Sequence, residues 1–284
     1  MAQTLGIALS GGGVRGLAHI SVLEAVDAAG IRPSAIVGTS MGAVLGALYA
    51  SGLSGAQIRD LIEQHVITRW DGLRQVLQKG QKLIHWATFF RPEWTRRGLL
   101  RADRFLSYVL SHIEAECFEE LQTPLSVVAV DYHQGTRVVL KEGRLQPAIR
   151  ASMSIPGVFS PILHEGKTLI DGGIADNLSY DLLHDVCSEI LVSDSFSPRS
   201  VTPETSPTTM GALQRGFEIL MRELGERKLA EDPPSFRVCS ELPGIHALDF
   251  HRIGDVLEAS STDLADLTRW LSHLDVSDRH NVMA

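Results

Sequence analysis

Two glycine-rich turns, each between a short apolar stretch and a helical pattern, most constrain how this chain can fold. The apolar stretch 5–9 leads into Ser-Gly-Gly-Gly, and residues 14–29 then carry a wide apolar face at helical spacing. Residues 35–37 form a second apolar stretch, which a further glycine separates from a helix-like run that begins at Met41. This order predicts a β-α-β unit followed by another helix, and such units give parallel strands with right-handed crossovers.

Later apolar stretches extend this pattern to an α/β fold with a mostly parallel central sheet. They predict strands at 125–130, 137–140, 167–170, 189–192 and 236–239. The 284 residues are 44% hydrophobic, which is enough to bury a large core, so we expect a single domain over 1–284.

Three segments of this domain differ in character. Residues 62–98 hold three of the four tryptophans and an excess of basic residues, and we interpret them as an inserted helical cap. Residues 195–209 are rich in Ser, Thr and Pro and predict an exposed loop. Residues 210–284 have a mostly helical pattern, interrupted by the strand at 236–239.

Charge and hydropathy limit the possible partners and location. A net charge of −8 provides no basic field, so we do not expect a nucleic-acid partner. The start of the chain lacks the pattern of a secretion signal, and the most apolar stretch, 41–50, is far shorter than the roughly 20 residues that a bilayer crossing needs. Three widely spaced cysteines suit reduced thiols. These features favour a cytoplasmic protein that does not span a membrane.

A serine lies on a tight turn at the end of the second predicted strand. The segment 38–42 matches G-x-S-x-G directly after a strand and directly before a helix. Gly38 and Gly42 supply the small flanks that such a sharp turn needs. The helix that begins at Met41 directs N–H groups toward Ser40, where they would stabilise the oxyanion of an acyl-transfer reaction. The alternative is a turn in which Ser40 only caps the helix.

The first glycine turn allows several interpretations. It fits the dinucleotide-binding pattern G-x-G-x-x-G, but that site needs a carboxylate after the second strand, where Ser40 lies instead. A Walker phosphate loop fails because no Gly-Lys-Ser/Thr follows. We therefore expect backbone N–H groups of this turn to form an oxyanion hole beside Ser40. The hole would comprise Gly11, Gly12, Gly13 and Met41. Arg15 either holds the loop by pairing with a carboxylate or carbonyl, or contacts an anionic substrate.

The general base is better assigned to an aspartate than to a histidine. Only one β-α-β unit precedes Ser40, which argues against the α/β-hydrolase order of serine, acid and histidine. For His19, within the first helix, we expect a hydrogen-bonded packing role. Asp171 follows an apolar strand and precedes Gly172 and Gly173, so we expect its carboxylate to face the crevice. Partial burial would raise its pKa and permit a Ser/Asp dyad, whereas a tight Asp-Gly-Gly turn without catalysis is the alternative.

Four motifs, in this order, resemble the bacterial patatin-like phospholipase family. They are SGGGVRG at 10–16, GTSMG at 38–42, ASMSIPGVF at 151–159 and DGG at 171–173. The resemblance runs from about residue 5 to about residue 255 and implies a three-layer α/β/α fold, a Ser40/Asp171 dyad and an oxyanion hole in the first glycine turn. One departure is Ser179, which stands where proline is common in the family, and we expect a looser loop there.

The leading functional hypothesis is a serine acyl hydrolase that cleaves esters of phospholipids or other lipid-like substrates through an acyl-enzyme. No metal or other cofactor is expected. The alternatives are a regulatory adaptor that keeps the fold and binds a protein partner, and a hydrolase of small esters or thioesters. The cap at 62–98 either covers the active-site crevice or also meets a lipid surface, which would place the protein peripherally at the inner membrane face.

Overall fold

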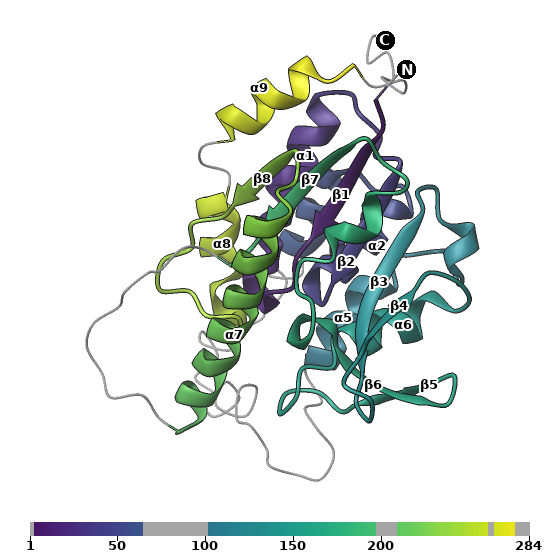
Figure 1. Cartoon of the computed structure of the whole chain (residues 1–284), viewed down its shortest axis with the longest axis vertical. Coiled ribbons are helices and arrows are strands. Elements are labelled where there is room, and N and C mark those ends of the chain that lie inside the picture. Colours follow the sequence, from purple (N-terminus) through teal and green to yellow (C-terminus); the bar gives the residue numbers. More distant parts are fainter. Residues whose placement is uncertain (1–2, 65–101, 197–208, 261–263, 276–284) are drawn as a thin grey trace, which may run out of the picture.

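The computed structural model describes residues 3–64, 102–196, 209–260 and 264–275, which form an α/β fold around one sheet (Figure 1). Within these ranges the sheet has eight strands in the order β5-β6-β3-β2-β1-β7-β8, with β4 paired to β3. The strands are β1 (Leu5–Leu9), β2 (Ala35–Thr39), β3 (Leu125–Asp131), β4 (Arg137–Leu140), β5 (Ile162–His164), β6 (Lys167–Asp171), β7 (Glu189–Asp194) and β8 (Phe236–Cys239).

The sheet is parallel at its centre and antiparallel at one edge. β1 runs parallel to β2 and β7, as does β3 to β2 and β8 to β7. β4 and β6 are antiparallel to β3, and β5 is antiparallel to β6. The sequence predicted every strand except β5, whose three residues are too few to show an alternating pattern. The mostly parallel sheet is thereby confirmed. The strands β4, β5 and β6 form an antiparallel arm at one edge, which the apolar pattern does not reveal.

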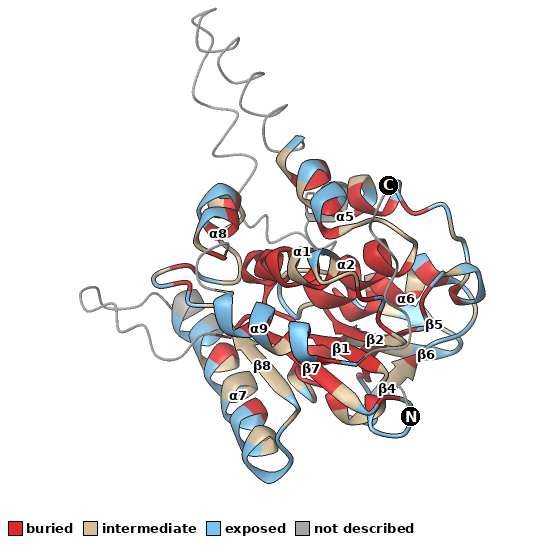
Figure 2. Ribbon diagram, turned by 90° about the horizontal axis from the view of Figure 1, so that it is seen from above, coloured by how far each residue is buried: buried red, intermediate tan, exposed pale blue. Residues whose placement is uncertain are grey.

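Helices cover both faces of the sheet. Figure 2 shows α1, α2 and α6 on one side of the strands and α7 on the other. The helices of ten residues or fewer are α1 (His19–Ala28), α2 (Met41–Ala50), α5 (Ala102–Leu110), α6 (Leu145–Ser152), α8 (Ile253–Ser260) and α9 (Ala265–His273), whereas α7 (Thr209–Glu231) has 23 residues. The short 3-10 helices are η1 (Gly13–Ala18), η2 (Phe118–Glu120), η3 (Gly172–Ile174), η4 (Tyr180–Leu183) and η5 (Phe250–Arg252).

Alternating side chains of the strands divide the buried residues into two clusters. Ile7 and Leu9 of β1 belong to the larger cluster under α1 and α2, whereas Ala8 points into a smaller one with Tyr180 of η4. This division follows from the two-residue period of a strand, which directs successive side chains to opposite faces. Apolar burial on both faces is what a three-layer fold requires.

Several predicted segments can be compared with the structure. The helical pattern at 14–29 starts as the 3-10 turn η1 before α1 begins. The predicted tail 210–284 is mostly helical where it is described, with β8 between α7 and α8. Of the expected loop 195–209, Ser195 and Phe196 are buried, and most of the rest lies outside the described residues, as does nearly all of the expected cap 62–98. None of the helices in the described ranges is long and apolar enough to cross a membrane.

Candidate active site

Ser40 lies on a strained turn between β2 and α2. Its φ of 53° and ψ of −121° fall in a region that residues with a side chain rarely occupy, and it is 2% exposed. The Ser40 N–H donates to Oγ of Ser152 at 2.8 Å, and Ser152 in turn donates to the Val128 carbonyl at 2.6 Å. This relay holds the turn in place, which is needed because such a conformation costs of order 1–3 kcal/mol.

Close packing between α2 and the end of β1 fixes the same turn. A Cβ atom on Gly42 would lie 2.2 Å from the Leu9 carbonyl oxygen, and one on Gly38 would lie 2.5 Å from the carbonyl oxygen of Gly42. Neither position has room for a side chain, so α2 can begin directly above the strand ends. Both glycines therefore lie where the sequence pattern placed the flanks of a sharp serine turn.

Asp171 reaches the neighbourhood of Ser40 from the antiparallel arm. It pairs with Ala129 of β3, while Thr39, the residue before Ser40, pairs with the preceding residue of β3, Val128. Ser40 and Asp171 therefore flank the same level of β3 from opposite sides. Gly172 begins η3 against the Val128 carbonyl, where a Cβ would lie 2.3 Å from the oxygen.

The Asp171 carboxyl is buried and only half satisfied by hydrogen bonds. Its Oδ1 accepts from the Gly173 N–H at 2.8 Å, while Oδ2 has no hydrogen-bond partner in the described part of the chain. Burial raises the pKa of Asp171 to about 6, and hydrogen bonding with Ser40 and Gly173 opposes that rise. The carboxyl is thus ionised at neutral pH but more basic than an aspartate in water.

Ser40 and Asp171 face each other without a well-formed hydrogen bond. The Ser40 hydroxyl is close enough to affect the pKa of Asp171, yet it donates to Sδ of Met153 at 3.6 Å. Catalytic hydrogen bonds are often long in the absence of substrate. The Oδ2 atom of Asp171 has no partner among the described residues and can accept a hydrogen bond.

The first glycine turn lies directly beside Ser40. A Cβ on Gly11 would be 3.0 Å from Cβ of Ser40, but the Gly11 N–H already donates to Oδ1 of Asn177 at 3.0 Å. The N–H groups of Gly12 and Gly13 make no backbone hydrogen bond to the described residues outside η1. Of the four N–H groups expected to form the oxyanion hole, those of Gly12 and Gly13 therefore remain available, as does that of Met41, the first N–H of α2, which has no intrahelical acceptor.

Arg15 is buried without the partner that the sequence suggested. It is 7% exposed, and its Nε and Nη2 atoms make no hydrogen bond to any described residue. The guanidinium lies 5.5 Å from the ring centre of Phe196. Burial lowers its pKa, which the carboxylates of Glu218 and Asp194 oppose. Among the described residues, the guanidinium thus contacts an aromatic ring and makes no hydrogen bond to a carboxylate or carbonyl.

His19 has the packing role expected for it. Its Nδ1 lies 2.7 Å from Oγ of Ser193 and its Nε2 lies 2.9 Å from the carbonyl oxygen of Ser10. Burial lowers its pKa to about 4, so the ring is neutral at physiological pH. The neutral ring ties the end of β1 to β7 below the glycine turn.

Three residues at the site were not assigned a role from the sequence. Ser152 holds the Ser40 N–H, Met153 accepts from the Ser40 hydroxyl, and Asn177 holds the first glycine turn. Ser152 and Met153 lie in the segment ASMSIPGVF, and Asn177 follows the DGG motif. The motifs therefore mark these residues, but the sequence does not show which atoms they contact.

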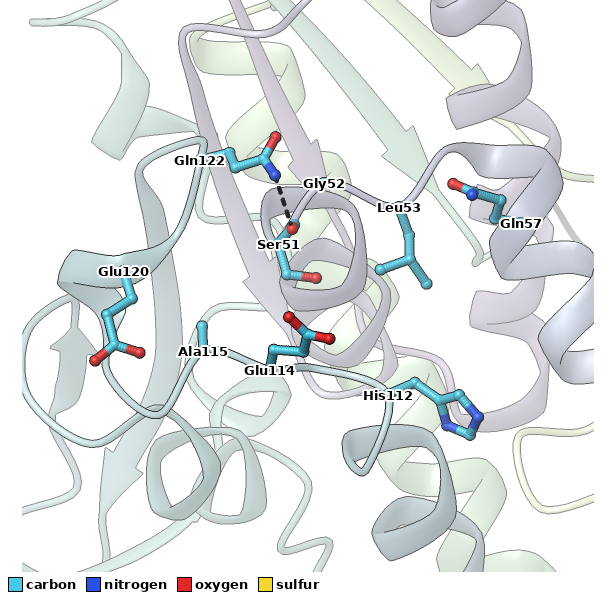
Figure 3. Close-up of a pocket in the computed structure, with 9 residues that line it drawn as sticks. All are labelled: Ser51, Gly52, Leu53, Gln57, His112, Glu114, Ala115, Glu120 and Gln122. Atoms are coloured by element: carbon cyan, nitrogen blue, oxygen red, sulfur yellow. Dashed lines mark hydrogen bonds between the residues drawn. The ribbon is translucent and has the colours of Figure 1, made fainter.

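A separate open cleft lies at the other end of α2. It has a volume of about 500 Å³ and is lined by Ser51, Gly52, Leu53, Gln57, His112, Glu114, Ala115, Glu120 and Gln122 (Figure 3). The ten residues of α2 separate it from Ser40, a distance of roughly 15 Å along the helix axis. Across the described residues, no group of three or more His, Cys, Asp or Glu could hold a metal ion.

The fold and this arrangement define an α/β protein with a serine on a sharp strand-to-helix turn and a buried aspartate facing it. The family model for patatin-like phospholipase matches residues 7–184. The chain therefore belongs to the patatin-like phospholipase family.

Curated relatives agree with this assignment. The chain is 32% identical over 206 residues to an uncharacterised NTE family protein of Mycobacterium tuberculosis, covering 69% of this chain and 50% of that protein. It is 27% identical over 224 residues to human patatin-like phospholipase domain-containing protein 6, covering 78% of this chain and 15% of the relative. Lysophospholipase NTE1 of Coccidioides immitis is 26% identical over 238 residues, with 82% and 14% covered. The chain thus spans half or less of the length of these relatives.

Solved structures resemble the chain more distantly. VipD of Legionella pneumophila aligns with a TM-score of 0.49 at 12% identity, over 95% of this chain and 67% of that one. The type III effector ExoU aligns with a TM-score of 0.43 at 12% identity, over 95% of this chain and 54% of that one.

Proposed function

We propose that this protein is a lipid acyl hydrolase that cleaves carboxylic esters with Ser40 as nucleophile and Asp171 as general base. The observation that carries the proposal is the strained Ser40 turn opposite a buried carboxyl whose Oδ2 atom has no hydrogen-bond partner in the described chain. Membership of the patatin-like phospholipase family supports an ester of lipid type. The relative named a lysophospholipase points to phospholipids with a single acyl chain among the candidate substrates.

The reaction proceeds through an acyl-enzyme. Oγ of Ser40 attacks the ester carbonyl while Asp171 takes the hydroxyl proton, and the tetrahedral intermediate then expels the alcohol, which receives that proton. A water molecule next attacks the acyl-serine, again losing its proton to Asp171. Release of the carboxylic acid returns the proton to Ser40 and restores the free enzyme.

Backbone N–H groups of two elements stabilise the oxyanion in both steps. Gly12 and Gly13 supply donors from the first glycine turn, and Met41 supplies one from the start of α2. Gly11 positions this turn through Asn177 and does not donate to the oxyanion. The helix dipole of α2 adds partial positive charge at the same point.

The proposal predicts a specific dependence on pH. Asp171 acts as a base only when ionised, and burial raises its pKa to about 6. Hydrolysis of an uncharged soluble ester should therefore fall as the pH is lowered through about 6 and level off above it. A rate limited instead by a group titrating well above pH 7 would contradict Asp171 as the base.

Labelling with a fluorophosphonate probe tests the nucleophile and base directly. The wild-type protein should be labelled, Ser40→Ala should not, and Asp171→Asn should be labelled about 100-fold or more slowly, in line with the usual contribution of a general base. Ser21→Ala is the matched control, because Ser21 is also a buried hydroxyl but bonds Ser260 remote from the site. Undiminished labelling of Ser40→Ala would overturn the assignment.

A further inference from the structure

Exposed apolar side chains gather on few elements of this protein. In the described part of the chain, seven large apolar residues are exposed, and four of them lie on α7. These four are Leu213, Ile219, Leu220 and Leu224, with 39–62% of each exposed. Two of the other three, Tyr132 and Leu163, lie on the antiparallel arm, and only Val186 lies elsewhere. Single exposed apolar residues need no explanation, but a concentration of this kind does.

The leucines of α7 form a stripe beside the candidate active site. Leu213, Leu220 and Leu224 are spaced by seven and four residues, so they share one side of the helix. The adjacent side of α7 faces the site, since Sδ of Met221 lies 3.1 Å from the position that a Cβ on Gly173 would occupy. Met221, which contacts the Asp171 turn, directly follows Leu220 of the stripe, so the stripe and the contact lie on neighbouring sides of α7.

Tyr132 and Leu163 approach the same edge of the sheet from the other arm. Leu163 pairs with Thr168, and the Tyr132 N–H donates to the Thr168 carbonyl at 2.8 Å, so the two side chains belong to neighbouring backbone. Tyr132 directly follows the C-terminal end of β3. Because β2 runs parallel to β3 and Ser40 directly follows β2, Tyr132 and Ser40 lie at the same end of the sheet. Figure 1 shows β5, β6 and the first turns of α7 at this same end of the sheet. Apolar groups thus lie on two sides of the edge that carries Ser40.

We propose that these residues form a lipid-docking face, made of Leu213, Leu220, Leu224, Tyr132 and Leu163, which seats the protein on a zwitterionic phospholipid surface with the Ser40 edge against the lipid. The inference rests on the proposed lipid hydrolase activity, because a substrate held in a lipid surface must reach Ser40 from that side. Leucine and tyrosine side chains favour the boundary between headgroups and acyl chains.

Charge decides which lipid surface is favoured. The chain has a net charge of −8, and two exposed glutamates of α7 are already paired, Glu223 with Arg222 and Glu226 with Arg237. An anionic surface would repel a chain of this net charge, whereas a zwitterionic surface carries no net charge. The exposed Arg227 lies on the same side of α7 as the stripe, but one cation does not offset the net charge of the chain, so the docking face depends mainly on apolar contact.

Co-sedimentation of the full chain with phosphatidylcholine vesicles tests this face. The triple variant Leu213→Ser, Leu220→Ser, Leu224→Ser should bind these vesicles about ten-fold or more weakly, because it removes most of the apolar contact. Val186→Ser is the matched control, since Val186 is 59% exposed but precedes β7 at the opposite end of the strands, and it should bind like the wild type. Leu220→Trp should bind more tightly, because tryptophan favours the headgroup zone.

A second readout separates this inference from the proposed activity. Hydrolysis of soluble nitrophenyl butyrate should be unchanged in the triple variant, which also shows that the variant is folded. Wild-type protein that does not bind vesicles, a triple variant that binds like the wild type, or binding that requires anionic lipid would each overturn the docking face. A triple variant that changes only the oligomeric state would assign the stripe to contacts between copies. If the wild type hydrolyses no ester but binds vesicles, and the triple variant loses that binding, the result would refute the proposed activity and leave the docking face standing.

Discussion

The Ser40 arm, which is the turn from β2 into α2, and the Asp171 arm, which is β6 with the loop that follows it, are held by different forces. Ser40 sits at the parallel centre of the sheet, where a Cβ on Gly42 would lie 2.2 Å from the Leu9 carbonyl oxygen, so close backbone packing fixes the turn. Asp171 ends a strand of the antiparallel arm, and the loop that follows it is tied down by ion pairs of Asp176 with Arg137 and Lys228. The Ser40 arm should therefore respond to volume, and the Asp171 arm to pH and salt.

The largest effect is expected from adding one methyl group to the Ser40 arm. Gly42→Ala would drive a Cβ into the Leu9 carbonyl, and the outward shift of α2 should lower the free energy of unfolding by about 3 kcal/mol or more. Thermal unfolding measures this loss, and fluorophosphonate labelling should fall with it because the Ser40 turn moves.

A glycine with open space provides the control for that substitution. A Cβ on Gly216 of α7 meets nothing within 4 Å, so Gly216→Ala should stabilise the protein by about 0.5–1 kcal/mol through helix propensity. Equal behaviour of the two variants would refute the claim that close packing holds the Ser40 arm.

The second effect has the opposite sign and belongs to the Asp171 arm. The pKa of Asp171 rises from an ordinary value of 3.8 to about 6 on folding. The contribution of this group to stability is therefore full below pH 3.8 and is lost as the pH rises through about 6. Asp171→Asn removes that loss and should raise the free energy of unfolding at pH 7.5 by up to about 3 kcal/mol.

Denaturant unfolding at two pH values checks this prediction. The advantage of Asp171→Asn should be largest at pH 7.5 and smaller at pH 5, where the wild-type carboxyl is mostly protonated. Asp266→Asn is the control, because Asp266 is 81% exposed and should give no such dependence. A variant less stable than the wild type at pH 7.5 would show that the carboxylate is better solvated than its burial indicates.

The sequence predicted the Ser40 arm more completely than the Asp171 arm, and the reason is physical. The elbow is a local structure, so the apolar stretch 35–37, the flanking glycines and the helix after Met41 were all visible within a few residues. The direction of β6 is a long-range property, because an apolar strand pattern is the same whether its neighbour is parallel or antiparallel. The aspartate could be found at a strand end, but the antiparallel route that brings it to Ser40 could not.

Contacts that join distant segments were missed for the same reason. Ser152 binds the Ser40 N–H across 112 positions in sequence, and Asn177 binds the Gly11 N–H across 166. Neither contact leaves a periodic pattern, so the sequence did not show that the Gly11 N–H is already bound by Asn177. Arg15 shows the same limit, since the aromatic ring on which it stacks belongs to Phe196, far along the chain.

The smallest effect tests whether electrostatics holds the Asp171 arm. Lys228 of α7 contacts Asp176 at 3.0 Å and also pairs with Asp181, and Arg137 binds the same two carboxylates. These side chains are 14–32% exposed, so screening reduces their contribution. Lys228→Met keeps the apolar stem and should lower the free energy of unfolding by about 1 kcal/mol at low salt.

Salt then separates the two arms. The loss caused by Lys228→Met should shrink in 1 M NaCl, because ions screen the partly exposed pairs, whereas the loss caused by Gly42→Ala should not change. Arg269→Met is the matched control, since Arg269 and Asp266 are 70% and 81% exposed and their pair should contribute almost nothing. If salt leaves the Lys228→Met loss unchanged, then screened ion pairs do not account for it, and the contact of the Lys228 ammonium with the Tyr180 ring, whose centre lies 5.1 Å from Nζ, holds the loop instead.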